Sequence, residues 1–334
     1  MKKLLPLLLA IALLVSCFAS CSETEPEIDG NVNIVVEANH DAVSAKILKG
    51  EIEIAVLPEP KATATILNAK KNGHNYAIKL NLSAEWDKVS DNALSMGCII
   101  VKNDFLKAHE GAFVSFMNEA KASIEYIGNS ANKSSAAQMI VDAGILPKLP
   151  IANSALDNLY GSIVYQDGEE MKNTLVSFYD AIELSKPASD FYYIPDTSAT
   201  SDNAKLRVGV MNGPTGMGLA KMINDYGKES DKYEFVAFSS TDAVSAALTS
   251  GDIDAACVPT NLAANLAAQK NDYISAAAIN CLGSLYVVVK DGVEINSIAD
   301  LKDKTVYYGD KTSTTEPILK YILSKNKLGA NVSE

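Results

Sequence analysis

The sequence predicts an α/β fold of two similar lobes, each built on a mostly parallel sheet flanked by helices. Two observations carry this prediction: a duplicated segment, and a second pair of units that share the order strand, loop, helix. The chain has 334 residues, which is enough for two packed domains. Hydrophobic residues make up 48% of it, so a sizeable core can form.

The duplicated segment lies at residues 41–60 (DAVSAKILKGEIEIAVLPEP) and 242–261 (DAVSAALTSGDIDAACVPTN). Each copy predicts an amphipathic helix, a glycine stop, a short buried strand and a proline-containing turn into another helix. A strand precedes each copy, at residues 32–36 and 235–238. Repeated units of this kind predict two similar lobes, each with a parallel sheet.

The second pair of matching units is placed differently in the two lobes. Residues 206–210 and 305–308 each predict a strand that is followed by a polar loop and a helix. The first unit precedes its copy of the duplicated segment, whereas the second lies near the C-terminus, far behind its copy. Reading residues 325–329 directly into residues 31–36 gives both lobes the same βαβαβ order. We interpret this order as a circular permutation; the alternative is a truncated tandem fusion.

Residues 1–21 predict a targeting segment that takes no part in the fold. Two lysines precede an apolar run, residues 4–15, that is short for a membrane span. Small residues stand just before Cys17 and Cys21, a pattern that resembles the bacterial lipobox. We favour lipid attachment at Cys21, because a polar tether (22–30) follows it directly, with Cys17 as the alternative. A plain cleaved signal or an uncleaved anchor is also open.

Charge and composition exclude several classes of partner. The net charge of −12 argues against nucleic acid and against anionic membrane surfaces. Arg207 is the only arginine, so the usual guanidinium grip on a carboxylate is almost unavailable.

The cysteines and histidines predict neither a metal site nor a disulfide framework. Three cysteines follow the targeting segment, each in or beside an apolar run that predicts a buried thiol: Cys98, Cys257 and Cys281. The histidines are scattered, without metal-ligand spacing and without neighbours that favour a general base: His40, His74 and His109. We therefore expect no cofactor and no metal.

Several stretches together resemble a known family. They are LRVGVMNGPTGMGLAKMI (206–223), GDIDAACVPTNLA (251–263), ADLKDKTVYYG (299–309), GEIEIAVLPEP (50–60), EWDK (85–88), MGCIIVKNDFL (96–106), DGEEMKNTL (167–175) and DFYY (190–193). In permuted order the chain resembles the type II periplasmic-binding-protein fold. It is most similar to the branch that serves transporters of nitrate, sulfonates, taurine and thiamine-pyrimidine precursors. The resemblance spans nearly all of residues 31–334, and the order of the segments is the departure from it.

The resemblance implies that the chain crosses between the lobes twice, near residues 285–289 and 98–101. The expected divisions are lobe one at 98–288, with a polar linker at 196–204, and lobe two at 31–97 plus 289–334.

The ligand is expected outside the carboxyl ends of the strands, where helix N-termini offer free N–H groups. We predict ligand contacts from four turns and from the single tryptophan, which could stack on a planar ligand. The predicted residues are Pro214, Thr215, Gly216, Met217, Thr260, Asn261, Ser313, Thr314, Thr315, Glu59 and Trp86. Helix capping explains the turn residues equally well, and a core role explains the tryptophan.

The resemblance implies an extracytoplasmic solute-binding lipoprotein rather than an enzyme. It would capture an oxyanion, a sulfonate or a pyrimidine-like molecule and deliver it to an ABC permease with its ATPase. The protein would be a monomer held by lipid on the outer face of the cytoplasmic membrane, in the periplasm of a diderm. The alternatives are a pyrimidine-synthase-like enzyme, a sensor that feeds no transporter, and a rearranged chain without function.

Overall fold

The computed structural model describes residues 28–195, 202–270, 272–311 and 313–333. The predicted targeting segment, Cys17, Cys21 and most of the 196–204 linker lie outside these residues.

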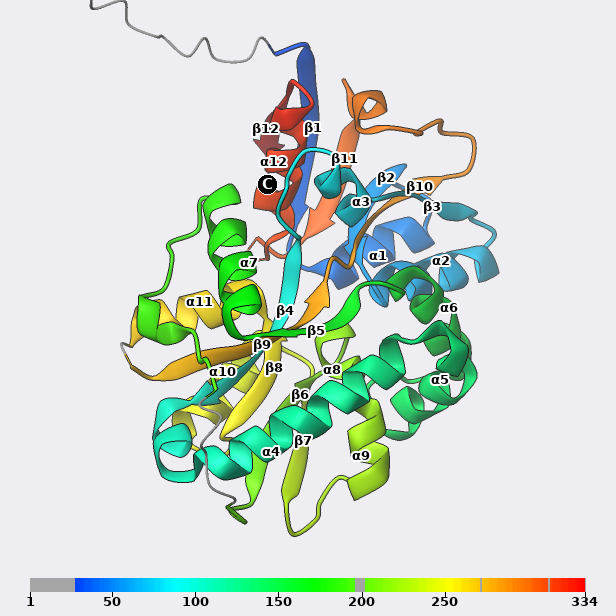
Figure 1. Cartoon of the computed structure of the whole chain (residues 1–334). Coiled ribbons are helices and arrows are strands. Elements are labelled where there is room, and N and C mark those ends of the chain that lie inside the picture. Colours follow the sequence, from blue (N-terminus) through cyan, green and yellow to red (C-terminus); the bar gives the residue numbers. More distant parts are fainter. Residues whose placement is uncertain (1–27, 196–201, 271, 312, 334) are drawn as a thin grey trace, which may run out of the picture.

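The described residues form two six-stranded sheets, each with helices packed on it, and Figure 1 shows them as two stacked lobes. The first lobe has the sheet order β5-β9-β4-β8-β6-β7 and the second has β12-β1-β11-β2-β10-β3. The strands are β1 Gly30–Glu37, β2 Ile54–Pro58, β3 Tyr76–Asn81, β4 Ser95–Lys102, β5 Ile163–Asp167, β6 Leu206–Met211, β7 Tyr233–Phe238, β8 Ala255–Pro259, β9 Ile274–Leu282, β10 Leu285–Lys290, β11 Thr305–Gly309 and β12 Leu328–Ser333. The predicted α/β fold of two lobes is confirmed.

Helices cover both sheets. Those of the second lobe are α1 His40–Leu48, α2 Lys61–Lys71, α3 Leu82–Asp87 and α12 Thr315–Lys325. Those of the first lobe are α4 Asn103–Gly128, α5 Lys133–Asp142, α6 Leu149–Leu159, α7 Gly168–Ala181, α8 Pro214–Met217, α9 Ala220–Tyr226, α10 Thr241–Ser250 and α11 Thr260–Gln269. Short 3-10 turns lie at Ser130–Asn132, Ser189–Phe191 and Ile298–Leu301. None of the helices in the described part of the chain is both long and apolar enough to cross a bilayer.

The two sheets share one internal order. In the first lobe β7, β6 and β8 run parallel, β4 is antiparallel to β8, and β9 follows on its far side. The second lobe repeats this as β1, β11, β2, antiparallel β10, then β3. β11 thus holds the position of β6, although it comes late in the chain.

The duplicated segment forms matching elements in the two lobes. Its helices are α1 and α10, and its strands are β2 and β8. The glycine stops, Gly50 and Gly251, have φ values of 71° and 82°. Glycine reaches this left-handed region at no steric cost, so each can end its helix and turn the chain into the following strand.

The chain crosses between the sheets through two strands. β4 follows α3 of the second lobe and enters the first-lobe sheet, whereas β10 follows β9 of the first lobe and enters the second-lobe sheet. One buried apolar cluster contains residues of both sheets, such as Val56 and Val258, while two further clusters belong to single lobes. The lobes therefore share part of their core.

Candidate functional site

Two predicted site threonines of the first lobe lie against the start of β4. The hydroxyl of Thr260 is 3.1 Å from that of Ser95, and both side chains are buried. Thr215 approaches Gly97 so closely that a β-carbon at Gly97 would lie 2.3 Å from its Cγ2. Gly97 therefore permits the contact, because any larger residue would push the Thr215 turn away.

A predicted threonine of the second lobe reaches the same stretch of β4. The Thr314 hydroxyl donates to the sulfur of Met96 at 3.9 Å, and Thr314 is buried. Three consecutive residues of β4 thus meet three predicted threonines, which come from both lobes. We call residues 95–97 with Thr215, Thr260 and Thr314 the crossover seam.

The turn that carries Thr215 depends on two glycines. Gly213 has a φ of 132°, which only glycine adopts readily. A β-carbon at Gly216 would lie 2.1 Å from the carbonyl oxygen of Met211. The neighbouring predicted residue Met217 is fully buried and packs in the first-lobe core, so its side chain offers no surface in this structure.

Asn280 of β9 also lies at the seam, and no sequence pattern predicted it. Its amide donates to the Thr215 carbonyl oxygen at 2.7 Å. Asn280 is 1% exposed, and its Oδ1 has no hydrogen-bond partner among the described residues. The Cys257 thiol is buried beside it, and burial raises the pKa of that thiol to about 12. The crossover seam therefore contains a buried oxygen, Oδ1 of Asn280, that accepts no hydrogen bond from the described residues.

The remaining turn residues occupy helix starts in both lobes. Thr260 opens α11, its carbonyl oxygen accepts the Tyr179 hydroxyl at 3.2 Å, and half-buried Asn261 follows it. Pro214 is the first residue of α8. Near α12, the N–H of Thr315 donates to the Ser313 hydroxyl at 3.3 Å. The Thr314 side chain occupies the cap position of α12 without capping it.

Glu59 is the counterpart of Thr260 in the duplicated segment, and it is 1% exposed. Its carboxylate accepts the Thr63 hydroxyl at 2.7 Å and the side-chain amide of Asn158, in α6 of the first lobe, at 2.5 Å. Burial raises the pKa of the Glu59 carboxyl, and the hydrogen bonds from Thr63 and Asn158 oppose that shift. The predicted ligand residue thus meets the other lobe.

Trp86 lies in the shared core. It is fully buried, and its Nε1 donates to the carbonyl oxygen of Asn92 at 2.5 Å. Its ring centroid is 5.9 Å from that of Phe178 in the first lobe and 4.4 Å from that of Tyr321 in α12. The chain itself therefore covers the tryptophan, and no ring surface is left for a ligand in this structure.

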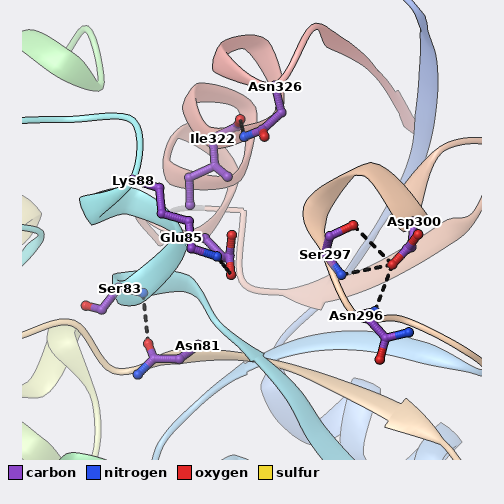
Figure 2. A network of polar contacts seen from close by, with 9 residues as sticks. All are labelled: Asn81, Ser83, Glu85, Lys88, Asn296, Ser297, Asp300, Ile322 and Asn326. Carbon is purple, nitrogen blue, oxygen red and sulfur yellow. Dashed lines mark hydrogen bonds and ion pairs between the residues drawn. The ribbon is translucent and has the colours of Figure 1, made fainter.

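Helix α3, which presents Trp86, is fixed at both ends (Figure 2). The Ser83 N–H donates to Oδ1 of Asn81 at 2.9 Å, which caps the helix start. Lys88 pairs with Glu85 at 2.7 Å. Glu85 itself is buried, at 8% exposed.

A polar group that the sequence did not predict gathers at the carboxyl ends of β1, β11 and β2. Burial lowers the pKa of His40, at the start of α1, while the nearby Asp310 carboxylate opposes that shift. Lys61 pairs with Asp41 beside it. The three strands bring these residues together from distant parts of the sequence, which explains why local spacing did not reveal them.

The buried cysteines agree with the prediction. Cys98, Cys257 and Cys281 are free thiols without exposed surface. Burial raises the pKa of each, to about 12 for Cys257 and Cys281. These thiols are therefore unreactive near neutral pH. Within the described ranges, no three His, Cys, Asp or Glu residues are grouped as metal ligands would be.

The single arginine lies away from the crossover seam. Arg207, near the start of β6, makes two side-chain hydrogen bonds to Asp254, at 2.8 and 2.6 Å. The Asp254 side chain is 8% exposed, so the pair neutralises a nearly buried carboxylate. The Arg207 side chain is therefore occupied by a structural ion pair with Asp254.

Comparisons with known proteins find only distant likeness. No family model matches the chain, and no curated protein is significantly similar in sequence. Two solved structures of an ancestral arginine-binding protein, bound to arginine or to glutamine, are 10% and 12% identical. Their TM-scores are 0.34 and 0.33, and each alignment covers 90% of this chain and 94% of that one. An amino acid ABC transporter substrate-binding protein, AbpA from Streptococcus pneumoniae, is 13% identical with a TM-score of 0.28, covering 88% of this chain and 87% of its own.

Proposed function

We propose that the chain is an extracytoplasmic solute-binding protein that holds a small molecule between its lobes and delivers it to an ABC importer. The observation that carries the proposal is the convergence of Thr215, Thr260 and Thr314, from both lobes, on residues 95–97. Ligands of open α/β sheets bind at the carboxyl ends of strands, where these threonines lie. The protein would act as a monomeric receptor rather than as an enzyme, and its partners would be the permease and the ATPase.

The buried polar groups favour a pyrimidine-like ligand over an oxyanion or a sulfonate. Glu59 is buried, and the donors that reach it, from Thr63 and Asn158, are neutral. Asn280 adds a buried oxygen without a hydrogen-bond partner among the described residues. Arg207 is already paired with Asp254. Acceptors of this kind suit N–H donors, such as the amino group of an aminopyrimidine, because leaving a buried acceptor unsatisfied is costly.

The ligand would contact the predicted turn residues after a rearrangement of the seam. Thr215, Thr260, Thr314, Thr315 and Glu59 are all buried by the chain itself, at 8% exposed or less. A hinge opening would expose them, and a ligand that bridges the lobes would stabilise closure by its contacts with both. Pro214, Gly216, Met217, Asn261 and Ser313 would shape the turns, and Trp86 would hold the lobes in register.

The chain order and the membrane tether complete the proposal. The Asp29 N–H donates to the carbonyl oxygen of Lys327 at 2.8 Å, so the entry to β1 lies against the end of α12. This contact and the shared strand order support a circular permutation. The proposed division, 31–97 plus 289–334 and 98–288, falls inside the two crossover strands, β4 and β10, whose sheets belong to the first and the second lobe respectively. Cys21, with Cys17 as the alternative, would carry the lipid.

A thermal-shift screen tests the proposal. Aminopyrimidines, alkyl sulfonates, nitrate and short acids are added separately, and unfolding is followed for each. A ligand at about a hundred times its dissociation constant adds about 2.7 kcal/mol to stability, which moves the midpoint by several degrees. We expect an aminopyrimidine to produce this shift. A cooperative melt that none of the compounds moves would contradict the proposal.

A further inference from the structure

Asn158 is a residue of the first lobe that makes two hydrogen bonds to residues of the second lobe. It is next to the last residue of α6 and is half-buried. Its side-chain amide donates to Oε1 of Glu59 at 2.5 Å. Its carbonyl oxygen accepts the hydroxyl of Tyr286, in β10, at 2.6 Å. The second lobe therefore binds both the side chain and the main chain of one residue.

The Glu59 side of this contact is rigid. Thr63 donates to the carboxylate twice, from its hydroxyl at 2.7 Å and from its N–H at 3.2 Å. The N–H of Glu59 donates to the carbonyl oxygen of Ser284 at 2.8 Å. Ser284 lies between β9 and β10, in the second crossover, so the backbone of Glu59 is held by the segment about which the lobes would turn.

The environment strengthens the contact. Glu59 is 1% exposed, and a hydrogen bond between an amide and a buried carboxylate is stronger than one in water. Opening the lobes would remove one of the three groups that donate side-chain or backbone hydrogen bonds to this carboxylate. It would also free the Tyr286 hydroxyl from its acceptor.

We propose that Glu59 and Asn158 form a latch that holds the lobes together before any ligand binds. A latch of this kind reduces the fraction of molecules that are open, and apparent ligand affinity falls by the same fraction. The Asn158 side chain thus donates to Glu59 at a position where a bound ligand could otherwise donate. The latch acts in the ligand-free protein, so it can be tested whether or not the proposed ligand class is correct.

The test measures the distance between the lobes in the ligand-free full chain. Spin labels are placed at Lys70→Cys in α2 and Ser134→Cys in α5, both exposed sites in different lobes. Cys17 and Cys21 are changed to serine throughout, and the other cysteines are fully buried. Pulsed electron resonance then gives the distribution of distances between the two labels.

The test variant is Asn158→Asp, which keeps the shape of the side chain but replaces the donor by a carboxylate facing Glu59. We expect its distance distribution to shift to longer values than that of the unsubstituted protein. The matched control, Asn153→Asp, makes the same change on the same helix, at a position whose side chain has no hydrogen bond to the second lobe in the described part of the chain, and it should keep the original distribution. An unchanged distribution in Asn158→Asp would overturn the latch.

A second variant covers the case in which Asn158→Asp does not fold. Tyr286→Phe removes only the hydroxyl that donates to Asn158. We expect it to populate the longer distances in part, while circular dichroism keeps the folded spectrum. A distribution identical to that of the unsubstituted protein would then overturn the latch.

Discussion

The two crossover segments are joined by a hydrogen bond from the N–H of Gly283 to the carbonyl oxygen of Leu94, at 2.8 Å. Leu94 directly precedes β4, and Gly283 directly follows β9. Gly283 has a φ of 58° and faces Ser83 at the start of α3. The passages between the lobes therefore meet at one point, which is where a hinge would be controlled.

Replacing Gly283 by alanine should destabilise the protein more than any glycine change made in open space. Its β-carbon would lie 2.6 Å from the Ser83 β-carbon, a clash that rotation of the serine hydroxyl cannot relieve, so α3 must shift. Left-handed strain costs about 1–2 kcal/mol, and overpacking adds about 1–3 kcal/mol. Gly292→Ala is the control, because Gly292 has a φ of 87° but nothing within 4 Å. Urea unfolding should separate the two variants; equal losses would contradict the steric account.

Trp86 should behave as a core residue. We expect Trp86→Ala to lose about 3–5 kcal/mol of stability, because the site is fully buried against Phe178 and Tyr321. Fluorescence emission from this single tryptophan should be blue-shifted, and acrylamide should quench it poorly. Trp86→Phe, the milder change, should keep any ligand binding. If Trp86→Phe lost ligand binding while its stability stayed unchanged, the result would contradict the core role and support the predicted stacking on a ligand.

The pair of Arg207 with Asp254 should contribute more than an exposed ion pair. Arg207→Ala leaves a carboxylate that is 8% exposed without its partner, and we expect a loss of about 2–3 kcal/mol. Lys205→Ala breaks a pair with Glu229, which is 75% exposed, and should cost under about 1 kcal/mol. Chemical denaturation measures both. A larger loss from Lys205→Ala would refute this assignment.

The stability difference between the protein and Glu59→Gln should depend on pH. Burial raises the pKa of Glu59 above its ordinary 4.5. Protonation therefore favours the folded state: the contribution of Glu59 is fully present below that ordinary value and is lost as pH rises through the raised pKa. The Tyr286 hydroxyl stays neutral over this range because burial raises its pKa. The melting temperature of Glu59→Gln should therefore rise relative to that of the unsubstituted protein as the pH increases. A difference in melting temperature that stays constant with pH would contradict a raised pKa of Glu59.

Local patterns predicted the elements well. The predicted strands at 206–210 and 305–308 lie in β6 and β11, and the repeat predicted the pairs α1 with α10 and β2 with β8. Hydrophobic period and glycine stops act over a few residues, so a sequence carries them directly. The final strand, β12, was not predicted, because it exists only through its pairing with β1.

The seam was predicted in part. The turns with Thr215, Thr260 and Thr314 follow from the positions of strand ends. Ser95 and Asn280 at the seam, and Asn158 at Glu59, were missed, because each acts through a contact with a residue far away in the sequence. The core role of Trp86 was one of the two readings of the sequence, but the partners that cover the ring come from α7 and α12 and could not be identified from it.

The most direct test of the account is a calorimetric titration of the strongest thermal-shift compound into the protein and into Thr260→Val. This variant removes the hydroxyl that lies 3.1 Å from Ser95 and keeps the shape of the side chain. Thr249→Val, on the exposed face of α10, is the control. The account predicts one-to-one binding that weakens about tenfold or more in Thr260→Val, the loss of about one good hydrogen bond, and stays unchanged in Thr249→Val. Equal affinity in all three proteins, or no binding heat in any, would contradict a ligand site at the crossover seam.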